Sequence, residues 1–219
     1  MEMDRYCQKI KDYWMNKNPK NYWGDDLDVR FLLIKKLSNL RNKRVLDIGC
    51  NIGVILRFID NSNKKYGIDI SPELITMAKK EIPGGVFRVA DAKKLPYKTN
   101  SFDVVLLVNM IEGIPINECN ARIAEAVRVL KKGGTLYLTT PNRLHIYYFF
   151  NNTFFPWELR ALILKHGLEV EEFITYNPLI LPSAWVAWIP YINQILDLLT
   201  NIPFTNMFGR GIYVKMKKL

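Results

Sequence analysis

One short stretch decides the fold of this chain: Val45-Leu46-Asp47-Ile48-Gly49-Cys50-Asn51-Ile52-Gly53. Its beginning, with Arg44 in front, is a short apolar run typical of a buried strand in a parallel sheet. A glycine-rich turn follows, and the pattern predicts that a helix begins at Gly53 and runs to Ile59. Such a turn lets a ligand approach the backbone closely and offers it the amides of a helix N-terminus.

Strands and helices are predicted to alternate along the rest of the chain. A serine cap and a proline at Ser71-Pro72 mark a helix start. Strands are expected at 44–48, 65–70, 86–90, 102–108, 135–140, 168–176 and 211–216, and helices at 71–81, 117–130 and 157–166. This alternation predicts an α/β fold, a doubly wound, mostly parallel seven-stranded sheet covered by helices on both faces.

The 219 residues are expected to form a single domain, because no linker or internal repeat divides them. Its predicted parts are a helical N-terminal cap (1–40), a core (41–176), an apolar insertion (177–209) and the last strand (210–219). The insertion has helical spacing at Ile192, Ile195 and Leu199. It could form a lid, an oligomer surface or an interfacial membrane helix, and a lid over an apolar pocket is favoured because its polar face is not basic.

Composition excludes several other classes of protein. The only cysteines are Cys7, Cys50 and Cys119, and with two histidines they make no metal-ligand pattern, so no metal site is expected. Cysteine usage and a polar N-terminus predict a cytoplasmic protein, and no apolar run is long enough to span a bilayer. The net charge is +10, and the sequence contains several lysine pairs, most of them at predicted helix ends or in turns. A solvated surface explains these pairs, and a nucleic-acid partner is not favoured.

Two acids lie at the ends of the next two strands, at the edge where open α/β sheets bind ligands. Asp69 lies 22 residues after Asp47, where a carboxylate accepts bonds from ribose hydroxyls, and Asp91 lies where an adenine would sit. A dinucleotide would also suit an acid in this place. The G-x-G-x-x-G spacing is absent, however, since Gly49 and Gly53 are four residues apart with Asn51 between them.

These features together resemble the class I S-adenosylmethionine-dependent methyltransferases, in particular the small-molecule branch with methyltransferase domain 11 and a V-L-D-x-G-C-G-x-G first motif. The resemblance extends over about residues 44–140 through five ordered motifs. They are VLDIGCNIG at 45–53, YGIDIS at 66–71, ADAKKLPY at 90–97, SFDVV at 101–105 and LKKGGTL at 130–136. Each motif alone is weak, but the five in this order are specific.

The resemblance implies that the cofactor is S-adenosylmethionine. Asp47 and the glycine loop would hold its methionine portion, Asp69 its ribose and Asp91, with the Ala92 backbone, its adenine. Asn109 and Met110, which end the fourth strand, would lie near the sulfonium. The cofactor-binding set predicted in this way is Asp47, Gly49, Cys50, Asn51, Gly53, Asp69, Ile70, Asp91, Ala92, Asn109 and Met110.

The sequence departs from the family pattern at two positions. Asn51 stands where glycine is usual, and asparagine tolerates the left-handed backbone better than most residues. Gly113 stands where many relatives have histidine. Cys50 has no base beside it in the sequence, so we interpret its thiol as a packing group and not as a nucleophile.

We therefore expect methyl transfer from S-adenosylmethionine to a small acceptor of apolar character. A general base is needed only if the acceptor must first lose a proton, and Glu112, His145 and Tyr22 are the candidates for it. Two alternatives stay open. One is an RNA or protein methyltransferase that uses the basic surface, and the other is a non-catalytic partner-binding protein on the same scaffold. Peripheral membrane contact through 177–209 is a further possibility.

Overall fold

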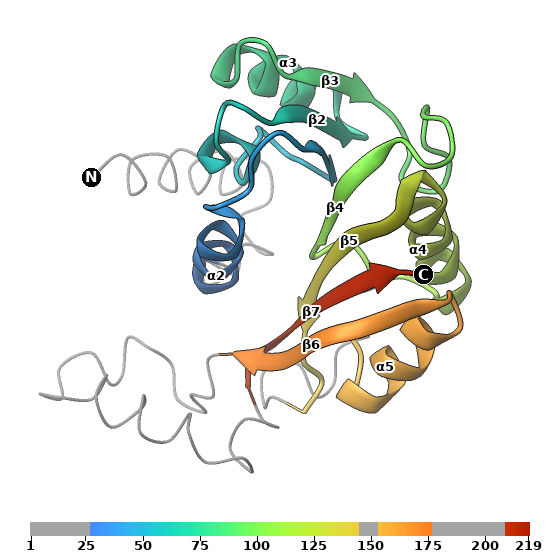
Figure 1. Ribbon diagram of the computed structural model, residues 1–219. Helices are drawn as coiled ribbons and strands as arrows, with labels where there is room; N and C mark the ends of the chain where they lie inside the picture. Colours follow the sequence, from blue (N-terminus) through green and yellow to red (C-terminus); the bar gives the residue numbers. More distant parts are fainter. Residues whose placement is uncertain (1–26, 145–152, 177–208) are drawn as a thin grey trace, which may run out of the picture.

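A seven-stranded sheet forms the centre of the protein, and the computed structural model describes residues 27–144, 153–176 and 209–219 (Figure 1). The strand order is β3-β2-β1-β4-β5-β7-β6. The bounds are β1 (Arg44–Ile48), β2 (Lys64–Asp69), β3 (Val86–Val89), β4 (Phe102–Val108), β5 (Leu130–Pro141), β6 (Leu168–Tyr176) and β7 (Gly211–Lys218). Strands β1 to β5 are parallel, and β7 pairs antiparallel with both β5 and β6. The prediction of a mostly parallel seven-stranded sheet is confirmed.

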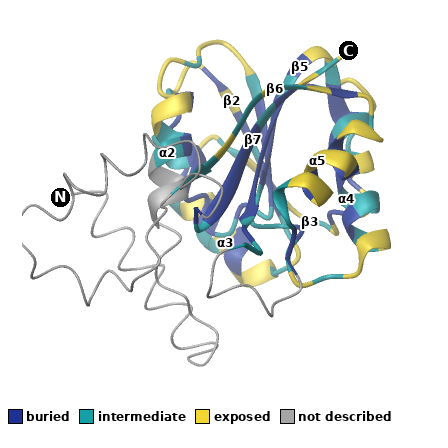
Figure 2. Ribbon diagram, turned by 90° about the horizontal axis from the view of Figure 1, so that it is seen from below, coloured by how far each residue is buried: buried dark blue, intermediate teal, exposed yellow. Residues whose placement is uncertain are grey.

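Helices cover both faces of the sheet, as the alternation predicted. Helices α4 (Ile116–Val129) and α5 (Pro156–Leu164) pack on one face. Helices α2 (Leu27–Leu37) and α3 (Pro72–Glu81) pack on the other. Figure 2 shows the buried strands in dark blue between these two helical layers. The structure is therefore doubly wound, with a hydrophobic core on each side of the sheet.

Helix α3 begins as the sequence predicts. The Ser71 hydroxyl accepts a hydrogen bond from the Leu74 amide at 3.3 Å, and Pro72 occupies the first turn. This cap satisfies one of the amides that a helix start leaves without an intrahelical partner. It also fixes where the chain turns after β2, which is one edge of the candidate site described below.

The helix predicted from Gly53 to Ile59 is wrong, because only a short 3-10 turn forms there, η1 (Leu56–Phe58). Nearly every apolar residue of this segment is buried, so the spacing of these residues marks no single helix face. Several of them, including Val54 and Ile55, are β-branched and disfavour the α-helix. The segment is thus a compact apolar turn.

The boundary between α4 and β5 also differs from the prediction. Residues 131–134 were expected to be a turn before a strand at 135, but β5 begins at Leu130, directly after α4. Leu130 is fully buried and pairs with Phe102, and the register shifts between Phe102 and Val104. Burial of Leu130 against β4 therefore extends the strand, and the irregular register accommodates the glycines that follow.

Parts of two predicted segments lie outside the described residues. Of the N-terminal cap, the structure describes α2 and the turn after it, and of the 177–209 insertion it describes only Gly209. The last predicted strand is confirmed as β7. Among the helices that the structure describes, none has the length and apolar character needed to cross a bilayer.

Gly67 in β2 is a position where the sheet leaves no room for a larger side chain. A Cβ atom built on Gly67 would lie 2.7 Å from both the Phe87 ring and the Cys50 sulfur. We predict that Gly67→Ala lowers the free energy of unfolding by about 1–3 kcal/mol, because the core must shift to make room. Urea denaturation measures this change. In a Phe87→Leu background the cost should fall, and an equal cost in both backgrounds would show that the ring is not the cause.

Candidate functional site

The candidate site lies at the carboxyl edge of the sheet, between β1 and β4. The strand order reverses there, since β1 pairs with β2 on one side and with β4 on the other. Loops that leave neighbouring parallel strands in opposite directions open a crevice, and open α/β sheets bind ligands in this crevice. The loops after β1, β2, β3 and β4 contribute the residues considered next.

The loop after β1 is a tight turn built on left-handed residues. Gly49, Asn51 and Gly53 have φ angles of 75°, 53° and 81°. The amides of Gly49 and Cys50 both donate to the Ile68 carbonyl at 2.8 Å, which ties the loop to the end of β2. The glycines are required by these φ angles, because side chains other than asparagine rarely adopt them.

Gly49 is also a point of close approach between two loops. A Cβ atom built on Gly49 would overlap the side chain of Met110, which comes from the loop after β4. The Met110 carbonyl accepts a hydrogen bond from the Arg122 guanidinium at 2.6 Å, so helix α4 holds this loop in place. The structure thus brings the predicted residues Gly49 and Met110 together.

Asn51 fits its left-handed position through its side chain. Its Oδ1 accepts a hydrogen bond from the Ile52 amide at 2.7 Å, and the Asn51 backbone amide donates to Asp69 Oδ2 at 3.0 Å. A local hydrogen bond of this kind is the reason that asparagine tolerates the left-handed region. The departure from the family's glycine therefore leaves the loop closed.

The Asp69 carboxylate joins two loops at the rim of the site. Besides the Asn51 amide on Oδ2, it accepts the Ser71 amide on Oδ1 at 3.0 Å. A carboxylate has about four acceptor positions, so each oxygen can accept one more hydrogen bond from a ligand. Ile70, beside it, is 74% exposed, which is unusual for an isoleucine and provides an apolar surface next to the carboxylate.

The other two predicted acids differ sharply in burial. Asp47 is 2% exposed within β1, whereas Asp91 is exposed on the loop after β3. Asp91 Oδ1 accepts the Lys93 amide at 2.8 Å, and its Oδ2 lies 3.9 Å from Lys93 Nζ. Ala92 is buried next to it. Asp91 therefore lies at the open rim, and Asp47 lies inside the sheet beneath the loop.

Cys50 is buried beneath the loop as a packing group. Burial, and secondarily the negative charges of Asp47 and Asp69, hold the pKa of the Cys50 thiol far above its usual range. A thiol that stays protonated at neutral pH is a poor nucleophile. These properties agree with the packing interpretation made from the sequence, and the cysteine's sulfur lies over Gly67.

Asn109 ends β4 in a left-handed conformation, with φ of 50°, and is locked onto β5. Its backbone amide donates to the Thr139 carbonyl at 3.0 Å and to the Thr139 hydroxyl at 3.3 Å. The same hydroxyl donates to Asn109 Oδ1 at 3.1 Å. These contacts fix the side-chain amide through Oδ1, and its Nδ2 group, with two N–H donors, has no partner within residues 27–144, 153–176 and 209–219.

Sequence reasoning missed Thr139 and Arg122, which position the loop after β4. A signal for Thr139 was present, because the predicted strand at 135–140 ends on two threonines at the ligand-binding edge of the sheet. Nothing local identifies Arg122, since an arginine on an amphipathic helix is normally a surface residue.

Only one of the three candidate bases, Glu112, lies among the described residues. Glu112 lies after Asn109 and Met110, and its Oε2 accepts the Ile111 amide at 3.1 Å. His145 and Tyr22 lie outside the described residues. Gly113, exposed with φ of 71°, offers no side chain. No group of three or more histidine, cysteine or acidic side chains that could hold a metal ion occurs in the described ranges.

Sequence comparison gives two findings for this chain. A family model described as a methyltransferase domain matches residues 46–138, which include the loop after β1, Asp69 and Asp91. A protein named ubiquinone biosynthesis O-methyltransferase, from Xanthomonas oryzae pv. oryzae, is 30% identical over 194 residues. The match covers 86% of this chain and 77% of that protein.

Structural comparison gives the same fold. An S-adenosylmethionine-dependent methyltransferase from Mesorhizobium loti superposes with a TM-score of 0.65 at 14% identity, covering 86% of this chain and 97% of the other. The [4+2]-cyclase SpnF superposes with a TM-score of 0.63 at 20% identity, covering 91% and 83%. Identities this low show a shared fold and not a shared reaction.

The left-handed Asn51 provides a direct test of the loop. We predict that Asn51→Ala lowers the free energy of unfolding by about 1–2 kcal/mol, because alanine in this region lacks the local hydrogen bond that offsets the steric cost. Asn51→Gly is the matched control and should change stability by about 0.5 kcal/mol or less. Urea denaturation of both variants measures the difference. Equal stabilities for the two would contradict the strained conformation.

Proposed function

Because the chain belongs to the S-adenosylmethionine-dependent methyltransferases, we propose that it transfers the cofactor's methyl group to an oxygen atom of a small acceptor of apolar character. The choice of oxygen rests on the curated relatives named as O-methyltransferases, which match over most of this chain. The single structural observation that supports the proposal is the Asp69 carboxylate. It holds the loop after β1 and keeps acceptor positions free at the switch point.

The residues of the loops fit the chemistry of the cofactor. In our proposal, Asp69 accepts hydrogen bonds from the ribose hydroxyls, and the exposed side chain of Ile70 lies against the adenine. Asp91 and Ala92 lie at the adenine's edge. The loop after β1, with Asp47, Gly49, Cys50, Asn51 and Gly53 as its predicted members, holds the methionine portion, because residues without bulky exposed side chains let a ligand reach the backbone.

The protein's own task in such a reaction is mainly to position the acceptor. When bound, S-adenosylmethionine supplies the activated methyl group and its leaving group. The acceptor oxygen must then be held in line with the methyl and kept from water. We propose that Asn109 donates from Nδ2 to the acceptor oxygen, since Thr139 already fixes the other end of that amide. Met110, which covers Gly49, would bound the same space.

A general base remains a separate proposal. Glu112 is the candidate within the described residues, and it would have to exchange its hydrogen bond with the Ile111 amide for one with the acceptor. His145 and Tyr22 are proposed from the sequence alone. A donor such as Asn109 reduces the demand on any base, because a hydrogen bond to the charged form of a hydroxyl favours its ionisation.

Cofactor binding is tested by calorimetry with S-adenosylhomocysteine, the demethylated product. We predict that Asp69→Ala weakens binding by about tenfold or more, because the charge-assisted hydrogen bonds to the ribose are lost. Asp60→Ala is the control, since Asp60 is a half-exposed acid before β2 at the opposite edge of the sheet. Unchanged affinity for Asp69→Ala, or no binding by the native chain, would refute the assignment.

The role of Asn109 is tested with catechol as a small hydroxyl acceptor. Asn109→Ala should lower kcat by about 10² while affinity for S-adenosylhomocysteine is kept, because one fixed donor is lost from the reacting oxygen. The rising limb of kcat against pH should also move to higher pH, since the donor lowers the pKa of the bound acceptor when present. Asn120→Ala, on α4, is the control. An unmoved pH limb would reject the role of Asn109.

A further inference from the structure

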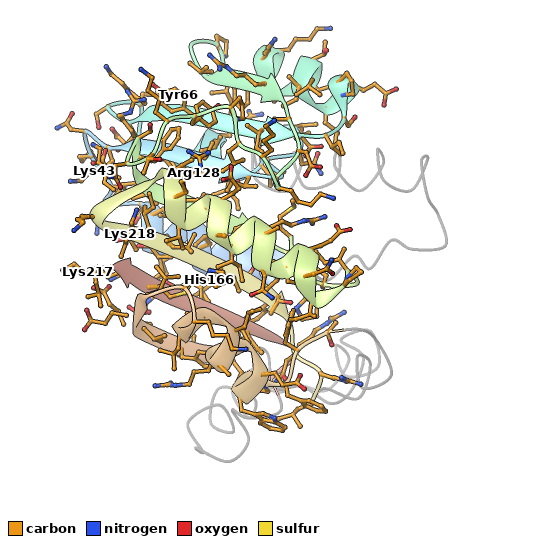
Figure 3. The ribbon with its side chains drawn as sticks, turned by 90° about the vertical axis from the view of Figure 1, so that its right-hand side faces the viewer. Lys43, Tyr66, Arg128, His166, Lys217 and Lys218 are labelled. Carbon is orange, nitrogen blue, oxygen red and sulfur yellow. The ribbon has the colours of Figure 1, made fainter. Side chains whose placement is uncertain are left out.

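A row of lysines crosses the opposite, amino edge of the sheet. The row consists of Lys64, Lys43, Lys131, Lys132, Lys218 and Lys217, in the order of the strands they adjoin. Figure 3 shows Lys43, Lys218 and Lys217 along one edge of the molecule. We call this set the basic row. No residue of it belongs to the candidate cofactor site.

Sheet topology brings these lysines together from distant parts of the chain. Parallel strands share an edge for their amino ends, so Lys43 and Lys64 are neighbours, with the Lys64 amide donating to the Lys43 carbonyl at 2.8 Å. Strand β7 runs antiparallel, so its carboxyl end reaches the same edge, where Lys217 pairs with Thr135 in register. Strands lie about 4.8 Å apart, so a row over five adjacent strands extends about 19 Å.

Most of the positive charge in the row is unneutralised. Lys131 pairs with Asp103 at 2.7 Å, and Lys218 donates to three uncharged oxygens, those of Asn100 Oδ1, Val127 and Leu130. The exposed members are Lys43, Lys64, Lys132 and Lys217. None of these four forms an ion pair with any residue in the described ranges, although Glu169 lies opposite Lys217 in register.

Charges within the row influence each other. The pKa of Lys218 is held below its usual value, first by burial and then by the positive charge of Lys132. The pKa of Asp103 is also lowered, because the hydrogen bonds from Lys131 and the Arg44 amide, with the charges of Lys131 and Lys43, outweigh the effect of its partial burial. The edge is therefore a region of positive potential, and one carboxylate lies in its centre.

Aromatic side chains at this edge are occupied by packing. Tyr66, Tyr97 and Phe102 form an edge-to-face cluster with ring centroids 4.9–6.1 Å apart. The Arg44 guanidinium lies 4.9 Å from the Tyr66 ring centroid and donates to the Ser101 carbonyl. Among the described residues, these three rings at this edge are therefore not free to stack on a ligand, and what the edge offers a ligand is positive charge.

We propose that the basic row binds the phosphodiester backbone of a single-stranded nucleic acid. A line of cations about 19 Å long follows the path of one phosphodiester strand, whereas a bilayer presents a broad plane of headgroups. The row lies at the edge opposite the cofactor site. The nucleic acid is thus a docking partner, and the methyl acceptor is a different molecule.

Fluorescence anisotropy with a labelled oligothymidylate of about 20 nucleotides tests this proposal, at KCl concentrations from about 50 to about 200 mM. If the four exposed lysines contact phosphates, the slope of log K against log salt is about −3. Lys43→Gln/Lys132→Gln should halve the slope and weaken binding about tenfold or more at the lowest salt. The control is Lys94→Gln/Arg160→Gln, which removes the same number of positive charges from two exposed residues away from this edge. This control should leave binding unchanged.

Three results would overturn the proposal. One is the lack of salt-dependent binding by the native chain, and another is an equal loss of affinity in both double variants, which would assign binding to net charge alone. The third is binding to phosphatidylglycerol vesicles that depends on Lys43 and Lys132 while the oligonucleotide does not bind. All three are independent of the methyl acceptor, so they leave the proposed function untouched.

Discussion

The hydrogen bonds of the Asp69 carboxylate are the constraint on which the rest of the site depends. One carboxylate accepts the Asn51 amide from the loop after β1 and the Ser71 amide at the start of α3. These loops leave two adjacent strands, and without a shared acceptor their amides would have to donate to water instead. By fixing both loops, the carboxylate also fixes its own direction, which a ligand's hydroxyl groups require. The side chain that we propose as the ribose-binding group is thus the same one that holds the two loops together.

Close packing around small residues determines the shape of the crevice. Gly49 lies against Met110, and Gly67 lies beneath Cys50 and Phe87. Because neither glycine has a side chain, the loop after β1 can lie directly against the loop after β4 and against β2. At Gly49 and Asn51 the backbone must also adopt a positive φ, which few residues other than glycine and asparagine tolerate. Dense packing of this kind keeps loop positions defined, and defined loops are what an in-line transfer needs from the protein.

Parallel strands separate the two edges of the sheet chemically. Loops after the carboxyl ends carry the acids and the amides of the candidate site, whereas the turns before the amino ends carry the basic row. The antiparallel β7 adds to this asymmetry, because its carboxyl end, with Lys217 and Lys218, lies at the amino edge of its neighbours. A single sheet can therefore present a small-molecule site and a polyanion surface that do not overlap.

The sequence by itself determined the alternation of strands and helices, the loop at residues 49–53 and the acids that follow the strands, because these depend on local periodicity, capping and glycine placement. It failed at Gly53–Ile59, where most residues are buried in two core clusters and the spacing of apolar residues marks no single helix face. Only the tertiary structure decided that Thr139 locks Asn109 and that distant lysines form one row. Those pairings arise from strand order and register, which join residues far apart in the chain and leave no local pattern.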